Sequence, residues 1–364
     1  MKGLYIASIT KNRPRDLGVL NKIYGQLDGF KSEEVDMDFI FMKDNYIYRN
    51  NEKIKMVRKN NSLYFFKRLC EFFKGNCDEY KFVYIRYSVA NIFLLKLCKI
   101  FYKLNIKVIL ELPTYPYKKE LNIYSPALKF LMNIADNYVS KNLHKYVENI
   151  ICFTNDEEIY GIKTISIENG IDLKKIEFTG YVKQKELNLI AVANVTFAHG
   201  YDRLINGLSE YYKNDWERDV YFHIVGESLE ANKLKQLVNN LELNEKVIFY
   251  GSKHGEELTD VYKKCQMGVA SLGIYRIGLN QVSILKAREY TARGIPFILG
   301  YYDNSFINSN YVIKVPNNDE HINIKDILEF YDSCNILDTE IRNDAERLTW
   351  HSQIKKIMYA INCK

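Results

Sequence analysis

The chain has 364 residues, 47% of them hydrophobic and 26% charged, which is ordinary for a globular protein and long enough for two domains. No run reaches transmembrane length, no secretory signal follows Lys2, and the seven scattered cysteines show neither disulfide nor zinc spacing. We therefore expect a cytoplasmic protein with reduced thiols. The formal charge of +6 is uneven, because residues 1–175 hold 29 Lys and Arg against 20 Asp and Glu.

Two series of strand-like runs alternate with helical segments along the chain. The first series comprises residues 4–8, 37–42, 82–86, 108–112, 150–153 and 164–167, and the second comprises 187–193, 220–225, 247–250, 267–270, 296–299 and 312–315. Such alternation predicts α/β domains with parallel sheets and crossover helices. The domains are predicted at 1–175 and 187–343, with a polar linker at 176–186 and a C-terminal helix at 344–364 that returns to the first domain.

The most informative segment runs from residue 281 to residue 298. A charged, helix-forming stretch is followed directly by Gly294-Ile295-Pro296 and a short apolar strand. Helical spacing puts Lys286 and Glu289 near one face, so that an amine and a carboxylate point together toward the helix N-terminus. Helix N-termini favour phosphate, so the segment predicts an anion-binding element.

This segment resembles the nucleotide-sugar-binding element of family 4 glycosyltransferases with the GT-B fold, whose pattern is Glu-x7-Glu, a small residue, Gly, an apolar residue and Pro. Glu289 falls on the second Glu, which in that family holds the donor ribose. Gln281 takes the place of the first Glu, and Ser283 begins the helix. The resemblance implies two Rossmann-like domains that face a cleft, with the donor in the second.

Further segments of the second domain match the family in the expected order. The loop 194–200 follows a strand, and in the family it carries a basic pair that grips the donor diphosphate. Asn194 and His199 occupy those positions here, and Gly200 permits close approach of the backbone to phosphate. Gly226 and Ser252 follow two other strands, where ligands of such folds lie. These residues complete the predicted donor site.

The predicted catalytic residues come from both domains. Arg276 and Lys286 are expected to offset the charge of the leaving diphosphate, so we expect a metal-independent reaction and no cofactor beside the donor. In the first domain, the loop from Glu111 to residue 117 is similar to one in bacterial polysaccharide glycosyltransferases, and Glu111, Thr114 and Tyr115 are proposed from it by position. Structural roles remain an alternative for each. Gly18, ahead of the first helix, joins the donor-binding set.

The resemblance implies a retaining glycosyltransferase that moves a sugar from a nucleoside-diphosphate sugar to an acceptor, most plausibly a lipid-linked bacterial surface glycan. A nucleotide-sugar 2-epimerase and a non-catalytic GT-B partner are the alternatives. The basic first half suits an anionic membrane surface better than nucleic acid, so we expect attachment to the inner face of the membrane. Helices at 62–74 and 89–103 combine apolar and basic residues and are the candidates for that contact, unless their apolar faces pack on the sheet.

Overall fold

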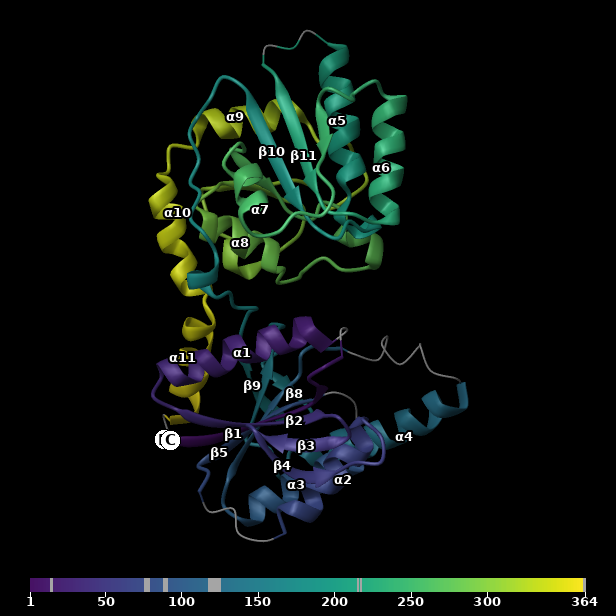
Figure 1. Cartoon of the computed structure of the whole chain (residues 1–364), viewed down its shortest axis with the longest axis vertical. Helices are drawn as coiled ribbons and strands as arrows, with labels where there is room; N and C mark the ends of the chain where they lie inside the picture. Colours follow the sequence, from purple (N-terminus) through teal and green to yellow (C-terminus); the bar gives the residue numbers. More distant parts are fainter. Residues whose placement is uncertain are drawn as a thin grey trace. The chain divides into compact units, whose positions relative to one another are not determined.

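The computed structural model describes residues 1–13, 16–74, 79–87, 91–116, 126–214, 216 and 218–362, without the side chains of 126–129, 131 and 362. The chain forms two compact units (Figure 1). Unit 1 comprises Met1–Gly170 with Trp350–Lys364, and unit 2 comprises Ile171–Thr349.

Unit 1 is built on a mixed sheet of order β4-β3-β2-β1-β5-β6-β7-β9-β8. Its strands are β1 (Lys2–Thr10), β2 (Asp36–Lys43), β3 (Tyr46–Arg49), β4 (Glu52–Met56), β5 (Phe82–Arg86), β6 (Lys107–Glu111), β7 (Asn149–Cys152), β8 (Glu158–Ile159) and β9 (Ile162–Ser166). Its helices are α1 (Leu17–Ser32), α2 (Ser62–Phe72), α3 (Ile92–Lys103), α4 (Pro126–Leu143) and α11 (Trp350–Asn362). The central strands are parallel, whereas β3, β4 and β8 are antiparallel to their neighbours.

The alternating side chains of β1 show how this sheet is covered on both faces. Leu4 and Ile6 pack in the cluster that includes α2, α3 and α4, whereas Tyr5 and Ala7 pack in the cluster that includes α1 and α11. Successive strand residues point to opposite faces, so a strand buried on both sides reads as a continuous apolar run. The run at residues 4–8 therefore predicted a strand but not which helix covers which face.

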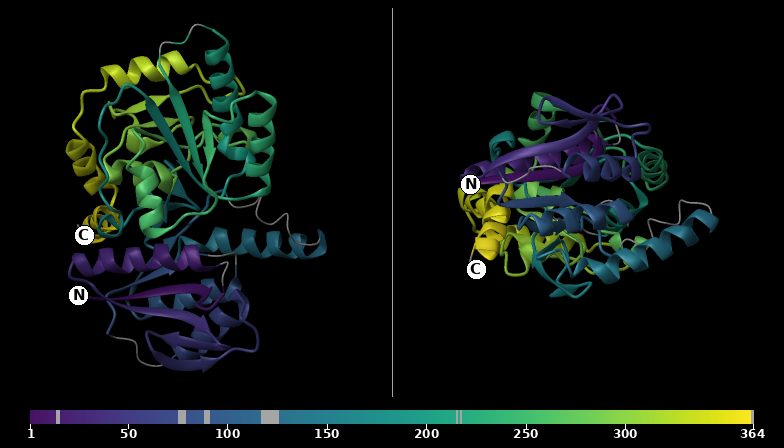
Figure 2. Two further views of the ribbon diagram at one scale, coloured as in Figure 1. Left: turned by 45° about the horizontal axis from the view of Figure 1, so that its top comes forward. Right: turned by 90° about the horizontal axis from the view of Figure 1, so that it is seen from below.

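Unit 2 contains a six-stranded parallel sheet of order β12-β11-β10-β13-β14-β15. Figure 2 shows this sheet with helices packed around it. Its strands are β10 (Leu187–Val192), β11 (Val220–Val225), β12 (Val247–Phe249), β13 (Met267–Val269), β14 (Phe297–Leu299) and β15 (Val312–Lys314). Its helices are α5 (Tyr201–Lys213), α6 (Leu229–Asn240), α7 (Gly255–Tyr262), α8 (Leu285–Arg293), α9 (Ile324–Ser333) and α10 (Asp338–Asp344). Short 3-10 turns are η3 (Leu173–Lys175), η4 (Phe197–His199), η5 (Ile274–Ile277), η6 (Asn304–Phe306) and η7 (Ala345–Leu348).

The strand order of unit 2 decides where a ligand can bind. Counted within the unit it reads 3-2-1-4-5-6, the Rossmann order, in which the chain reverses direction across the sheet between β10 and β13. The loops that leave these two strands diverge there. Ligands of open parallel sheets bind at this point, beyond the carboxyl ends of the strands. The α/β fold class with two Rossmann-like sheets is thus confirmed.

The segment predicted as a linker packs against unit 2. The backbone N–H groups of Thr179 and Gly180 both donate to the Arg293 carbonyl, at 3.1 and 2.9 Å. The Tyr181 hydroxyl donates to the Ile336 carbonyl at 2.8 Å. Residues 176–186 are therefore a strap held by hydrogen bonds, which a polar composition without periodicity did not reveal.

The apolar face of helix α2, which its composition suggested for membrane contact, is buried. Phe65, Phe66 and Leu69 have no exposed surface and lie in the unit 1 core, which leaves Leu63 and Lys67 outside. The apolar face of α2 therefore packs on the sheet, the alternative given above. Among the described residues, no helix is long and apolar enough to cross a bilayer.

Five cysteines are described, and all are free and buried: Cys70, Cys98, Cys152, Cys265 and Cys334. Cys77 and Cys363 lie outside the described residues, as do Tyr117 and the first residues of the segment predicted as a helix at 89–103.

Candidate functional site

The loops after β10 and β13 meet at the reversal point of the unit 2 sheet. The Leu272 backbone N–H donates to the His199 carbonyl at 2.8 Å, which joins the two loops. Gly200 lies between them with φ of 61°, and a Cβ there would stand 2.6 Å from the Gly273 nitrogen. Only glycine meets both conditions, because other side chains strain at positive φ and would collide with the backbone. The backbone of Gly200 thus closely approaches a protein loop, and its predicted approach to phosphate stays a prediction.

His199 is held as a neutral imidazole. The Thr196 backbone N–H donates to its Nδ1 at 2.8 Å, so Nδ1 is the unprotonated nitrogen and Nε2 carries the proton. Burial and the nearby Lys286 amine lower the pKa of His199 to about 3. At neutral pH His199 can therefore offer a phosphate one N–H donor but no positive charge.

Lys286 supplies the amine of the site. Its Nζ donates to the Tyr201 hydroxyl at 2.7 Å, and the residue is 9% exposed. Burial lowers the pKa of Lys286 to about 7, although the Glu289 carboxylate acts in the opposite direction. An amine with this pKa stays half protonated at neutral pH, and a bound anion would favour its charged form.

Glu289 lies one helical turn beyond Lys286 on α8. Its carboxylate accepts hydrogen bonds from Arg293 four residues later, at 3.2 and 3.3 Å, and its side chain keeps 32% of its surface exposed. The carboxylate is thus oriented by Arg293 and remains open to solvent. This is what a group that accepts hydrogen bonds from ribose hydroxyls requires.

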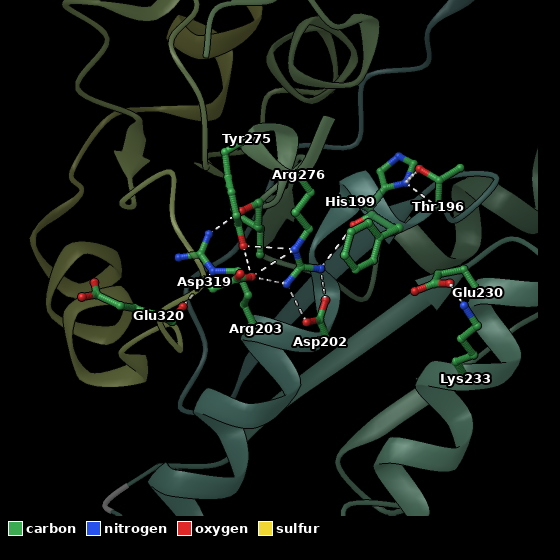
Figure 3. Close-up of polar contacts among 12 residues, drawn as sticks. Thr196, His199, Asp202, Arg203, Glu230, Lys233, Tyr275, Arg276, Asp319 and Glu320 are labelled. Carbon is green, nitrogen blue, oxygen red and sulfur yellow. Dashed lines mark hydrogen bonds and ion pairs between the residues drawn. The ribbon is translucent and has the colours of Figure 1, made fainter. Parts of the chain in front are cut away.

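Arg276 differs from the expectation that it faces the diphosphate. Figure 3 shows its guanidinium between Asp202 on α5 and Asp319. Both oxygens of Asp202 accept from it, at 2.7 and 2.8 Å, and Asp319 accepts at 2.9 Å. A cation that already faces two carboxylates has little charge left for a third anion. We therefore assign Arg276 to holding the loop in place.

A second arginine, which the sequence did not single out, also fastens these loops. Arg203 is 1% exposed and lies on α5, where Figure 3 shows it beneath the Arg276 cluster. It donates to the Glu320 carbonyl at 2.7 Å, to the Leu272 carbonyl, and to Asn318 at 3.3 Å. The sequence signal that could have singled out Arg203 is an arginine next to an aspartate at the start of a helix. Charged residues are common at helix starts, so this signal does not distinguish a buried arginine from a surface one.

The remaining unit 2 candidates line the same edge of the sheet at different depths. Asn194, Ser252 and Gln281 are exposed, whereas Ser283 is half-buried before α8. Gly226 has φ of 132° and sits against the Ala193 carbonyl, so packing between the loops of β10 and β11 already requires a glycine there. At this edge, Lys286 lies within electrostatic reach of both His199 and Glu289.

In unit 1, Glu111 ends β6 inside a closed polar network. Its carboxylate has no exposed surface and accepts from Tyr84 at 2.7 Å, from Gln26 at 2.8 Å and from Arg86. Lys22 lies 4.0 Å away, and burial lowers the pKa of this lysine to about 7. The predicted contact between Glu111 and a substrate has no support in this geometry, because every approach is occupied by protein. Glu111 anchors the carboxyl edge of the sheet instead.

The two other residues of that loop reach solvent. Thr114 is exposed, and Tyr115 lines a cavity of about 660 Å³ together with Tyr160 and the α4 residues Asn133, Asp136 and Asn137. Tyr115 and Tyr160 are packed edge to face with ring centroids 6.0 Å apart. Aromatic rings beside amide and carboxylate groups suit a sugar, whose CH faces stack and whose hydroxyls bond.

Gly18 lies in the first turn of α1, not ahead of it as expected. It is exposed, and an added Cβ would meet no atom within 4 Å. Nothing in the packing requires glycine at this position. Over the described residues, no group of three or more His, Cys, Asp and Glu side chains is arranged to hold a metal ion.

The comparison with protein families identifies the part of the chain that carries this site. Residues 174–299 match the family described as glycosyl transferases group 1. The matched range lies inside unit 2 and contains both loops and α8. Mannosylfructose-phosphate synthase from Agrobacterium fabrum is 26% identical over 129 residues, which cover 34% of this chain and 27% of that protein.

Solved structures resemble the whole chain at low sequence identity. A glycosyltransferase from Rickettsia africae superposes with a TM-score of 0.64 at 15% identity, covering 99% of this chain and 97% of that one. A lipopolysaccharide outer core galactosyltransferase gives 0.62 at 13% identity, with 99% of both chains covered. The Anabaena protein HepE, solved with UDP, gives 0.59 at 12% identity over the full length of both. These findings establish the GT-B fold and support a glycosyltransferase.

Proposed function

We propose that this protein is a retaining glycosyltransferase that takes a sugar from a nucleoside-diphosphate sugar. The observation that carries the proposal is the grouping of His199, Lys286 and Glu289 at the reversal point of the unit 2 sheet, inside the range that matches group 1 glycosyl transferases. An N–H donor, an amine and an oriented carboxylate match the phosphates and the ribose of one ligand. Retention of anomeric configuration follows only from the family resemblance.

The three residues take different roles in this proposal. Lys286, protonated when the anion binds, offsets the diphosphate charge, and the Nε2–H of His199 donates to a phosphate oxygen. Glu289 accepts hydrogen bonds from the ribose hydroxyls. As the sugar leaves, charge grows on the diphosphate, so a fixed cation there favours the transition state more than the bound donor. We propose that this cation takes the place of a metal ion.

The acceptor, in the same proposal, is a glycan that binds in the unit 1 cavity beside Tyr115 and Tyr160. A lipid-linked bacterial surface glycan fits the basic first half of the chain, since its carrier would place it at an anionic membrane. The lipopolysaccharide galactosyltransferase noted above has a related fold, and its name gives the lipopolysaccharide outer core as the glycan on which it acts. The protein would then work in the cytoplasm at the inner face of the membrane.

The test begins with nucleotide binding. Calorimetry with uridine diphosphate, followed by other nucleoside diphosphates, should find a ligand whose affinity falls about 10- to 100-fold in Glu289→Ala, since a hydrogen bond to a charged group contributes roughly 1.5–3 kcal/mol. Glu329→Ala removes an exposed carboxylate from α9 and is the matched control. Equal affinities for Glu289→Ala and the parent chain would refute the ribose assignment.

Turnover separates the proposal from its alternatives. Release of nucleoside diphosphate that requires an acceptor, and that persists in excess chelator, is the expected result. Conversion of the donor to another nucleotide sugar without an acceptor would indicate an epimerase. Tight donor binding without turnover on any acceptor would indicate a non-catalytic partner. This alternative is motivated by Gln281, which stands where the family pattern has its first Glu.

A further inference from the structure

The helices α2, α3 and α4 of unit 1 lie on one side of the sheet, where α3 contacts both α2 and α4, and α4 extends beyond the other two helices (Figure 1). Their inner rows share one core cluster, which includes Phe66 of α2, Leu97 of α3 and Val139 of α4. The opposite rows therefore point away from the sheet. We call the residues on these outward rows the α2–α4 outer face.

The α4 part of this face carries a stripe of exposed apolar side chains. Phe130, Ile134 and Tyr138 are 65%, 54% and 56% exposed. They recur every four residues, so they line up along one side of the helix. Residues of this size are seldom left exposed in a row on a helix of a globular protein, and such a row marks a surface that meets something apolar.

The charge around the stripe indicates which apolar partner the stripe meets. Among its described side chains, the α2–α4 outer face carries five exposed lysines, namely Lys67, Lys96, Lys99, Lys103 and Lys141. The described parts of the three helices contain two carboxylates. Glu71 is paired with Arg68 at 2.7 Å, and Asp136 is 5% exposed. Among the described residues of these helices, the face is therefore positive, and its two carboxylates are either paired or buried.

We propose that the α2–α4 outer face docks on an anionic lipid bilayer. Phe130, Ile134 and Tyr138 enter the headgroup boundary, while the lysines of α2 and α3 face the lipid phosphates. An interfacial helix combines an apolar row with basic residues in this way, and aromatic side chains settle at the boundary between lipid and water. A protein surface with an apolar row and an acidic rim is the competing occupant, and a second copy of this chain is distinguished below by the oligomeric state of the variants.

The unit 1 cavity lies close to the stripe, which links membrane docking to acceptor binding. This link alone rests on the proposed function. Asn133 and Asn137 line the cavity from α4, and at about 100° per residue their row lies roughly a quarter turn from the apolar stripe. A bilayer touching the stripe therefore passes beside the cavity mouth. A glycan on a lipid carrier would reach the cavity without leaving the membrane.

Vesicle flotation with the full chain tests the proposal without donor or turnover, so its failure is distinguishable from failure of the proposed function. The chain should float with vesicles of phosphatidylcholine containing phosphatidylglycerol, remain unbound with pure phosphatidylcholine, and dissociate as salt is raised. Replacing Lys96, Lys99 and Lys103 by Glu should weaken binding at least about 100-fold, since each basic residue contributes about 1 kcal/mol, or roughly fivefold. The same change at Lys213, Lys264 and Lys325 of unit 2, also exposed, is the matched control.

A second variant tests the stripe itself. Phe130, Ile134 and Tyr138 are replaced together by Ser, and the exposed Leu229, Ile307 and Leu337 of unit 2 are replaced likewise as the control. All six side chains are exposed, so unchanged thermal unfolding should confirm that both proteins fold. Loss of flotation in the α4 variant alone supports the proposal. Three results would overturn the proposal: equal flotation of both variants, binding to neutral vesicles as strong as to anionic ones, or no vesicle binding by the parent chain. If the α4 variant loses dimers but still floats, the stripe serves self-association instead.

Discussion

Lys286 makes the affinity for a nucleoside diphosphate depend on pH. Its amine has a pKa of about 7 in the free protein, and an anion bound beside it raises that pKa, so binding takes up a proton above pH 7. We expect affinity to fall up to about tenfold per pH unit above pH 7. Calorimetry between pH 6 and 8.5 measures this slope. Lys286→Met should bind weakly with a flat profile, and an unchanged slope in that variant would assign the proton to another group.

Arg276 shows how a residue of the expected type is used differently. Its guanidinium joins Asp202 to Asp319, so Arg276→Ala leaves two carboxylates without their shared partner. The free energy of unfolding should fall by roughly 1–3 kcal/mol, the cost of losing hydrogen bonds between charged groups. In the same unit, Arg218→Ala removes the more exposed pair with Asp332 and should cost less than about 1 kcal/mol.

Urea unfolding of the two variants measures both values. Nucleoside-diphosphate affinity, measured well below the unfolding transition, should change little in Arg276→Ala. A large loss of affinity with unchanged stability would return Arg276 to the diphosphate.

At the scale of elements, the contact between α1 and α11 ties the end of the chain to unit 1. Gly25 and Gly29 of α1 lie against Trp350 and Ile354 of α11, and Gly170 packs on the Trp350 ring. Gly25 and Gly170 leave the space that the indole fills, and Gly29 leaves room for the Ile354 side chain and the Trp350 backbone. The α11 helix thus completes the layer that covers the α1 side of the sheet. The contact is long-range, because Gly25 and Trp350 are separated by 325 residues along the chain.

Two substitutions on one helix test this contact. Gly25→Ala forces a methyl group into the Trp350 ring and should destabilise the protein by roughly 1–3 kcal/mol. Gly18→Ala on the same helix meets no atom within 4 Å and should be neutral or stabilising by up to about 1 kcal/mol, since alanine favours helix over glycine. Chemical denaturation compares them. Equal effects would mean that α11 does not pack as described, and weakened nucleotide binding in Gly18→Ala would support its predicted place in the donor site.

At the scale of the whole molecule, the two units should respond differently to the donor nucleotide. Ligand that binds only the folded state stabilises it by about 2.7 kcal/mol at a hundred times its dissociation constant. Hydrogen exchange with saturating nucleoside diphosphate should therefore slow in unit 2, most of all at residues 194–200 and 271–289. Protection confined to Met1–Gly170 would show that the donor binds in unit 1.

Much of the fold could be predicted because apolar runs bounded by turns are local signals. All six strands of unit 2 were located within a residue or two, since parallel strands buried on both faces are continuously apolar. The antiparallel strands β3 and β4 were missed, because Glu52–Met56 is largely exposed and lacks an apolar run. The strap at 176–186 was missed for a related reason, as hydrogen bonds of backbone groups leave no trace in composition.

The sequence by itself determined the α/β class, the two series of strands and the neighbourhood of Glu289, because these depend on periodicity and on a Gly-Ile-Pro turn within a few residues. Only the tertiary structure decided which charges are free. Arg276 and Lys286 look alike in sequence, yet one faces two carboxylates and the other a tyrosine hydroxyl. Likewise α2 and α4 are both apolar and basic, yet packing buries Phe65 and Phe66 of α2 and leaves Phe130 of α4 exposed. A side chain's partner and its burial are set by residues far away along the chain, which no local pattern contains.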